Sequence, residues 1–90
     1  MTEFVEMKIQ EAVVTLSDEL NYARASEKLN ITQPELKRQI TELENQLKLQ
    51  IFRMNGEGVE VTEAGQVFAN ACRTFLATRS GQGAKSKIQD

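Results

Sequence analysis

The sequence predicts a mainly α-helical domain that carries one small β-hairpin. Apolar residues recur at spacings of three and four in several separate segments, which is the periodicity of helices with one buried face. Asn55-Gly56, a strong turn signal, stands between two short apolar segments, as in a hairpin. The chain has 90 residues, of which 40% are apolar and 27% charged, and this suffices for one soluble domain with a modest core.

The first helix is expected over about residues 3–20, where the apolar residues fall on one face. Those residues are Val5, Ile9, Ala12, Val13, Leu16 and Leu20. Asn21 is a good N-cap for a short second helix over residues 22–29, because its side-chain oxygen can accept a bond from a first-turn N–H. Ala25 and Ser26 are small, as a close crossing of two helices requires.

The third helix has the clearest start in the chain. Thr32 followed by Glu35 forms the pattern of a capping box, and Pro34 falls in the first turn, where its missing N–H is not needed. Four apolar residues then make a stripe that faces the core: Leu36, Ile40, Leu43 and Leu47. Four polar residues are expected on the opposite, solvated face: Gln33, Lys37, Gln39 and Glu44. The helix is expected to end near Lys48.

A two-stranded hairpin is expected next. Leu49, Ile51 and the residues that follow can form one strand, and the alternating residues 59–61 can form the returning strand. Asn55-Gly56 supplies the turn, because both residue types tolerate the left-handed backbone that tight hairpins need.

A last helix is expected from Thr62, its N-cap, to about residue 79. Its apolar residues form one broad stripe: Ala64, Phe68, Ala71, Cys72, Phe75 and Leu76. This stripe is wider than a small three-helix core requires, so we expect part of it to face another subunit. Residues 80–90 are rich in Gly, Gln, Lys and Ser and are expected to be a linker or flexible tail.

In chain order these elements make a helix-turn-helix followed by a wing. We expect a winged helix-turn-helix with a three-helix core and a two-stranded wing over residues 1–62. A C-terminal linker or dimerisation helix over residues 63–79 and a tail over residues 80–90 follow it. This arrangement presents the N-terminal part of the third helix to the major groove of duplex DNA.

The charge distribution is compatible with that partner, although the net charge is −2. Residues 1–20 and 41–70 are acidic overall, whereas residues 21–40 carry four basic and two acidic side chains and residues 71–90 carry four basic and one acidic. Positive charge is therefore concentrated where a helix-turn-helix would meet phosphate.

Other classes of function have little support in the sequence. No apolar run approaches the ~18 residues of a membrane span, so no membrane partner is expected. One cysteine, Cys72, and no histidine cannot supply the usual zinc ligands, and a lone cysteine fits a reducing cytoplasm. We find no nucleophile–base pair and no phosphate-binding glycine loop, so neither an enzyme nor a cofactor is expected.

Over roughly residues 4–80 the chain resembles the winged helix-turn-helix of LysR-type transcriptional regulators. The resemblance rests on the order and spacing of short motifs rather than on any one of them. These are Ala25-Ser26 with Leu29, Thr32-Gln33-Pro34, Leu36, Arg38-Gln39-Ile40, Leu43-Glu44, Leu47, Ile51-Phe52, Gly56-Glu57-Gly58-Val59 and Thr62-Glu63-Ala64-Gly65.

The resemblance implies that Thr32, Gln33 and Pro34 begin a recognition helix on which Lys37 and Arg38 face DNA. It also implies that the wing approaches the flanking minor groove and that the last helix pairs antiparallel in a homodimer. On that helix the candidate interface residues are Phe68, Ala71, Cys72, Phe75 and Leu76. A domain that binds an effector ligand normally follows in this family and is absent from this chain.

The chemistry of these side chains suits duplex DNA. Gln33 can bond the N6 and N7 edge of adenine, and Arg38 can bind guanine or phosphate. Tyr22 and Arg24, at the start of the second helix, are candidates for phosphate contacts, as is Arg53 in the wing. For Tyr22, core packing is the favoured interpretation, and Arg53 fits a solvated strand residue equally well.

The chain departs from the family pattern at several positions. Lys37 stands where Ser is usual, which adds a charge that can reach phosphate. Met54, Glu57 and Glu60 stand where the wing usually carries basic residues, so we expect weaker wing contacts. Lys48 stands where glycine is usual, and a left-handed backbone there would cost about 1 kcal/mol.

We therefore expect a regulator of transcription that binds double-stranded DNA sequence-specifically, as a dimer, with its recognition helix in the major groove. The alternative is a winged-helix module for protein interaction or dimerisation that has little DNA affinity. The acidic wing and the negative net charge are the features that favour the alternative.

Overall fold

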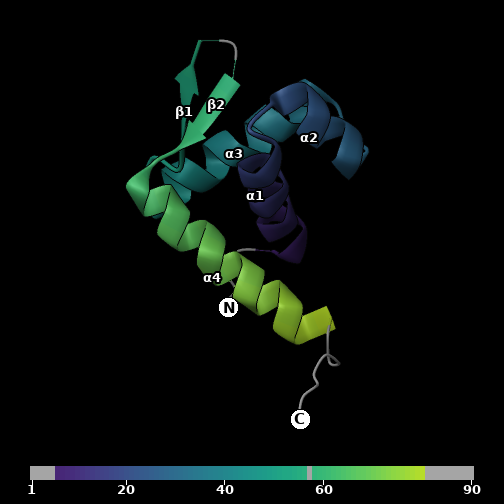
Figure 1. The fold of residues 1–90 in the computed structure, drawn as a ribbon, viewed down its shortest axis with the longest axis vertical. Coiled ribbons are helices and arrows are strands. Elements are labelled where there is room, and N and C mark those ends of the chain that lie inside the picture. Colours follow the sequence, from purple (N-terminus) through teal and green to yellow (C-terminus); the bar gives the residue numbers. More distant parts are fainter. Residues whose placement is uncertain (1–5, 57, 81–90) are drawn as a thin grey trace.

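The computed structural model describes residues 6–56 and 58–80, which form four α-helices and one two-stranded antiparallel sheet (Figure 1). The elements, in chain order, are α1 Met7–Glu19, α2 Tyr22–Leu29, α3 Gln33–Leu47, β1 Phe52–Asn55, β2 Gly58–Val61 and α4 Glu63–Ser80. The predicted mainly α fold with a two-stranded wing is confirmed. The expected helical residues 3–5, the wing acid Glu57 and the tail from residue 81 lie outside the described residues.

The first helix ends one residue earlier than expected. Leu20, predicted to belong to the buried stripe, has a left-handed backbone (φ 55°) and is 40% exposed. Its N–H still bonds the carbonyl of Leu16 at 2.8 Å, so it closes the helix as its C-cap. The carbonyl of Leu20 accepts from the N–H of Val59 at 3.2 Å, which fixes the wing to the end of α1.

Side-chain caps begin α2 and α3 as predicted. The Asn21 side chain accepts from the N–H of Arg24 at 2.9 Å, and the Thr32 hydroxyl accepts from the N–H of Glu35 at 3.1 Å. The expected capping box is only half formed, because the Glu35 carboxylate accepts from side chains further along α3 instead of turning back to Thr32. Lys48, which ends α3, is left-handed (φ 57°), as expected at that position.

The wing is shorter than expected at its start. β1 and β2 pair from Phe52↔Val61 to Asn55↔Gly58, and Gly56 has a positive φ of 63° in the turn. Leu49, predicted to lie in the first strand, precedes it and is 41% exposed. The prediction was wrong because the Leu49 N–H completes the end of α3 by bonding a helix carbonyl at 3.2 Å.

Glu44 connects α3 to the wing. Its carboxylate accepts from the N–H groups of Ile51 at 2.8 Å and of Phe52 at 3.0 Å. The expectation that Glu44 lies with the solvated residues of α3 was therefore wrong. Ile51 is fully buried and belongs to neither helix nor strand, so its backbone N–H needs such a partner.

Thr62, which follows β2, connects the wing to α4. Its hydroxyl accepts from the Gly65 N–H at 2.9 Å, which confirms Thr62 as the N-cap of α4. Its own N–H donates to the Ile51 carbonyl at 2.9 Å, and its hydroxyl donates to the Gln50 carbonyl. Gly65 lies so close to this segment that a Cβ there would be 2.2 Å from the carbonyl oxygen of Ile51.

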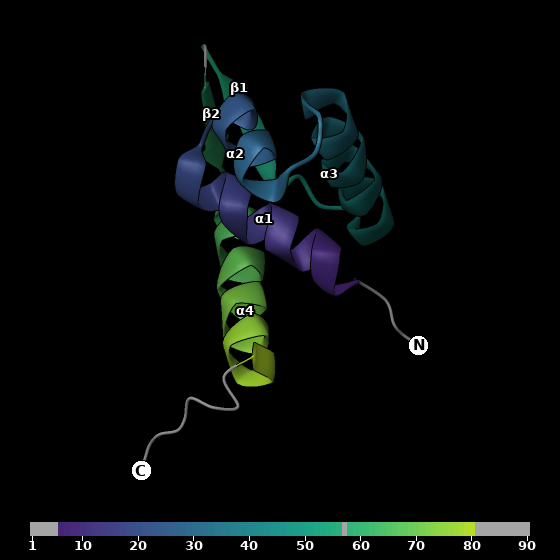
Figure 2. The same ribbon diagram turned by 90° about the vertical axis from the view of Figure 1, so that its right-hand side faces the viewer.

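One hydrophobic core joins the helices and the base of the wing. Its largest fully buried side chains come from α1, α3 and the segment before β1: Val13, Leu16, Leu36, Ile40 and Ile51. Ala25 and Ser26 are buried where α2 crosses its neighbours, as their small size predicted. Helix α4 packs on α1 with its first part and then extends away from the rest of the fold (Figures 1 and 2). Arg73 of α4 also pairs with Asp18 of α1 at 2.5 Å.

Replacing Gly65 with Ala tests the contact between α4 and the segment before β1. We expect Gly65→Ala to lower the free energy of unfolding by about 2–4 kcal/mol, because the added Cβ must push the Ile51 backbone away. Gly56→Ala is the matched control, since no atom lies within 4 Å of a Cβ there and only the positive φ opposes it. That control should cost about 1 kcal/mol. Urea unfolding followed by circular dichroism measures both, and equal losses would contradict the contact.

Candidate nucleic-acid interface

An open hollow lies where the first turns of α2 and α3 meet the wing. The residues that line it are Asn21, Tyr22, Ala23, Gln33, Pro34, Lys37 and Met54. Four of the residues predicted to bind DNA are thus brought together: Tyr22, Gln33, Pro34 and Lys37. Sequence reasoning did not single out Asn21 or Ala23 as site residues, and it treated Met54 only as a missing basic residue. Their meeting depends on the tertiary crossing of α2, α3 and β1, which no local signal reveals.

The polar side of the first turns of α3 is exposed. The exposed side chains here are Thr32, the cap residue, and Gln33, Pro34, Lys37 and Arg38. No other part of the described chain covers this surface. The free N–H groups of the first helical turn and the positive end of the helix dipole also lie here, which favours an anionic partner.

Tyr22 and Lys37 both line the hollow and lie close to each other. The Lys37 ammonium lies 6.0 Å from the centre of the Tyr22 ring, at the outer limit of a cation–π contact. Tyr22 is half-buried against the core, so the core-packing interpretation is correct, while part of its ring still lines the hollow. Burial, together with the nearby Glu44 carboxylate, raises the pKa of the Tyr22 hydroxyl, which therefore stays protonated at neutral pH.

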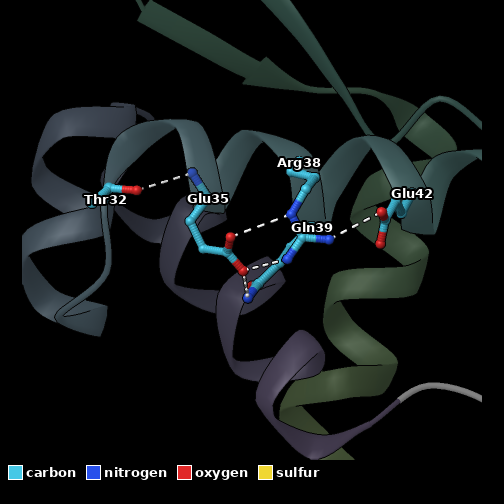
Figure 3. Close-up of polar contacts among 5 residues, drawn as sticks. All are labelled: Thr32, Glu35, Arg38, Gln39 and Glu42. Carbon is cyan, nitrogen blue, oxygen red and sulfur yellow. Dashed lines mark hydrogen bonds and ion pairs between the residues drawn. The ribbon is translucent and has the colours of Figure 1, made fainter.

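Arg38 lies on a different side of α3 from Gln33 and Lys37. Its guanidinium forms two bonds to the Glu35 carboxylate, at 2.5 and 3.2 Å, and one to Glu42 at 3.0 Å (Figure 3). It lines a second hollow, between α3 and the start of α1, together with Glu6, Lys8, Ile9, Glu35, Gln39, Glu42, Leu43 and Gln46. The expected common reading surface of Gln33, Lys37 and Arg38 is therefore divided between two sides of one helix.

The wing's predicted contact residue is also paired. Arg53 donates to Glu60 at 2.9 Å across the two strands, where the register sets the two residues opposite each other. Both side chains are about half exposed, so the pair is weak and can open. Among the described residues, Arg24 and Lys37 are exposed cations that form no ion pair within 4.0 Å, and both lie near the first hollow.

The predicted dimer residues of α4 fall into two groups. Cys72 is only 3% exposed, and Phe68 is half-buried against the monomer's own core, so neither offers a partner much surface. Leu76 is half-buried, whereas Ala71 is exposed and Phe75 is 41% exposed. Val67, which sequence reasoning did not single out, is 70% exposed on the same side of the helix. Burial raises the pKa of the Cys72 thiol to about 11, so at neutral pH it is an unreactive core group.

Neither a membrane-spanning helix nor a cluster of metal ligands is found in the part of the chain that the structure describes. No helix within residues 6–56 and 58–80 is long and apolar enough to cross a membrane. Over those same residues, His, Cys, Asp and Glu side chains do not gather in groups of three that could hold a metal ion.

Comparison with known proteins identifies close sequence relatives. Residues 8–66 match the family model described as bacterial regulatory helix-turn-helix protein, lysR family. The chain is 34% identical over 79 residues to the HTH-type transcriptional regulator AlsR of Bacillus subtilis, covering 88% of this chain and 26% of that protein. It is 35% identical over 71 residues to the regulator XapR of Escherichia coli, covering 79% and 24%. The chain therefore spans about a quarter of the length of these relatives.

Solved structures give the same result. A crystal structure of the BenM DBD with benA site 1 DNA superposes with a TM-score of 0.82 at 28% identity, covering 87% of this chain and 88% of that one. Vibrio fischeri DarR in complex with DNA superposes with a TM-score of 0.81 at 28% identity, covering 89% and 27%. The match to the first structure is nearly end to end for both chains.

The Glu35–Arg38 pair predicts a measurable pKa change. Hydrogen bonds from Arg38, then from Gln39, lower the pKa of the Glu35 carboxyl, with smaller help from the charges of Arg38 and Lys8. A lowered pKa means that the pair stabilises the fold above the usual glutamate pKa and is lost as the pH falls through the lowered value. Arg38→Gln should therefore raise the Glu35 pKa toward its usual value in a carbon-detected NMR titration. Lys37→Gln removes a neighbouring charge and serves as the control; equal pKa values in both variants would refute the pairing.

Proposed function

Because this chain belongs to the LysR family of bacterial helix-turn-helix regulatory proteins, we propose that it binds double-stranded DNA sequence-specifically and regulates transcription. The observation that carries the proposal is the exposed first part of α3, whose polar side chains lie free of the rest of the described fold. Two similar structures are described as complexes with DNA, which supports the same role here.

In the proposed complex, α3 enters the major groove. Gln33 is exposed at the first position of α3, where its amide can bond an adenine edge with two hydrogen bonds. Lys37 lies one turn further on the same side and can reach a guanine or a phosphate. Pro34 and the Met54 side chain, which is 58% exposed, add apolar surface beside them for base methyl groups or sugars.

Phosphate contacts fix the register of the helix in this proposal. Thr32, together with the free N–H groups at the start of α3, faces the DNA backbone on one side of the groove. Arg24 is exposed in the first turn of α2 and reaches the same strand. Arg53 reaches the backbone beside the wing only after its bond to Glu60 opens, so the wing contributes less than the recognition helix.

We further propose that α4 mediates a homodimer. Ala64, Val67 and Ala71 recur at spacings of three and four and are all exposed, so they form an apolar stripe beside the buried face. A soluble helix rarely keeps such a stripe in water, and an antiparallel partner helix would cover it. Two copies joined in this way would present two recognition helices to the two half-sites of an inverted repeat.

Residues 1–62 form the DNA-binding unit, α4 (Glu63–Ser80) forms the dimerisation helix, one residue longer than expected, and the rest of the chain is a connecting tail. In the whole protein, an effector ligand would bind a domain beyond this chain. The relatives are regulators, which supports a non-enzymatic role, and access to the chromosome requires a cytoplasmic location. A winged module without DNA affinity is not favoured, since similar structures include DNA complexes.

DNA binding is tested with a duplex selected from a random pool by the 90-residue chain. We expect Gln33→Ala to weaken binding to that site by about tenfold to a hundredfold, with little effect on a scrambled duplex. Lys37→Ala should weaken binding and reduce the salt slope by about one. Gln46→Ala, exposed near the other end of α3, is the control and should change neither. Loss of binding with Gln46→Ala alone would place the interface elsewhere, and no wild-type binding at low salt would favour the interaction module.

The dimer is tested by sedimentation equilibrium. Val67→Glu buries a charge in the proposed interface, so it should weaken self-association by at least about tenfold. Gln66→Glu adds the same charge at the neighbouring exposed position, on the polar side of α4, and should leave the association constant unchanged. A monomeric wild type at high concentration, or equal effects of the two variants, would exclude this surface as the interface.

A further inference from the structure

Arg38 is held by acids on both sides of it along its own helix. Glu35, one turn earlier, receives the guanidinium at 2.5 and 3.2 Å, and Glu42, one turn later, receives it at 3.0 Å. The three side chains are between 37% and 63% exposed, so the cluster is in contact with solvent rather than part of the core. Figure 3 shows the guanidinium lying along the helix between the two carboxylates.

Glu35 has other partners besides Arg38. Its carboxylate accepts from the Gln39 side chain at 3.1 Å, and its backbone N–H donates to the Thr32 hydroxyl at 3.1 Å. Lys8, from α1, adds electrostatic attraction. The guanidinium therefore lies on the α1 side of α3, away from the hollow where Gln33 and Lys37 lie.

A phosphate and a carboxylate compete for the same guanidinium fork. Both accept two parallel N–H bonds from arginine, so Arg38 cannot bind a phosphate fully while it binds Glu35 and Glu42. The local charge of the three side chains is also −1, which repels a phosphate until an acid is displaced or protonated. Binding of DNA by Arg38 must therefore be an exchange of partners.

We propose that Glu35 and Glu42 are positioning residues for DNA recognition, which hold Arg38 away from the base edges and reduce its attraction to phosphate. This inference rests on the proposed DNA-binding function. Its consequence is that base reading is left to Gln33 and Lys37, while Arg38 contributes to backbone binding only after exchange. The two acids lower affinity for every duplex and thereby leave a larger share of the binding energy to the sequence-reading residues.

A double-mutant cycle tests the inference, because loss of an acid alone would tighten DNA binding through simple charge. Glu42→Gln should tighten binding to the selected duplex by about twofold to fivefold and steepen the salt slope by up to about one. The same substitution in an Arg38→Gln background should give a smaller gain, since there is no guanidinium to release. Glu27→Gln, which removes an exposed acid of α2, is the charge-matched control in both backgrounds.

Fluorescence anisotropy measures the affinity of the wild type, the two single variants and the double variant for the selected and the scrambled duplex. With one of its two acids removed, Arg38 should raise affinity for both duplexes by a similar factor and steepen the salt slope of both, which a purely structural role of Glu42 would not do. Equal gains from Glu42→Gln in both backgrounds, or a gain no larger than that of Glu27→Gln, would overturn the inference while leaving DNA binding intact. Absence of wild-type binding to any duplex at low salt would overturn the proposed function and this inference together.

Discussion

The structure depends on how residues 50–52, which lead from the turn after α3 into β1, are held. Ile51 is fully buried yet lies in no helix or strand, so its backbone groups need partners from elsewhere. The Ile51 N–H donates to the Glu44 carboxylate, and the Ile51 carbonyl accepts from the N–H of Thr62. Gly65 allows α4 to approach this backbone closely. One short segment therefore fixes the wing and α4 relative to the recognition helix.

Residues 50–52 also affect the surface formed by the first turns of α2 and α3 and the wing. The Glu44 carboxylate accepts from the N–H groups of Ile51 and Phe52, so this acid of α3 is engaged by the backbone that leads into the wing. The wing then stands with Met54 beside the first turns of α2 and α3, which completes the hollow. Glu44, for which we expect no contact with DNA, thus helps to shape the surface that would bind DNA.

Ion pairing explains how an acidic chain keeps an exposed cation where the proposed function needs one. Three basic side chains are paired with acids of the same chain: Lys28 with Glu19, Arg38 with Glu35 and Glu42, and Arg53 with Glu60. Lys37 has no such partner within the described chain and lies beside the Tyr22 ring. Net charge therefore says little here, because position along α3 decides which charges are available.

The sequence by itself determined the features that act within one turn of the chain: the Asn21, Thr32 and Thr62 caps, the helix periods and the Gly56 turn. These rest on local hydrogen bonds and backbone preferences that neighbouring residues fully specify. Only the tertiary structure decided the partner of Glu44, the end of α1 at Leu20, the separation of Arg38 from Gln33 and the division of the α4 stripe. Each of these depends on which surfaces pack together when segments that are distant in sequence come into contact. The same pattern of apolar and polar residues is compatible with several such packings.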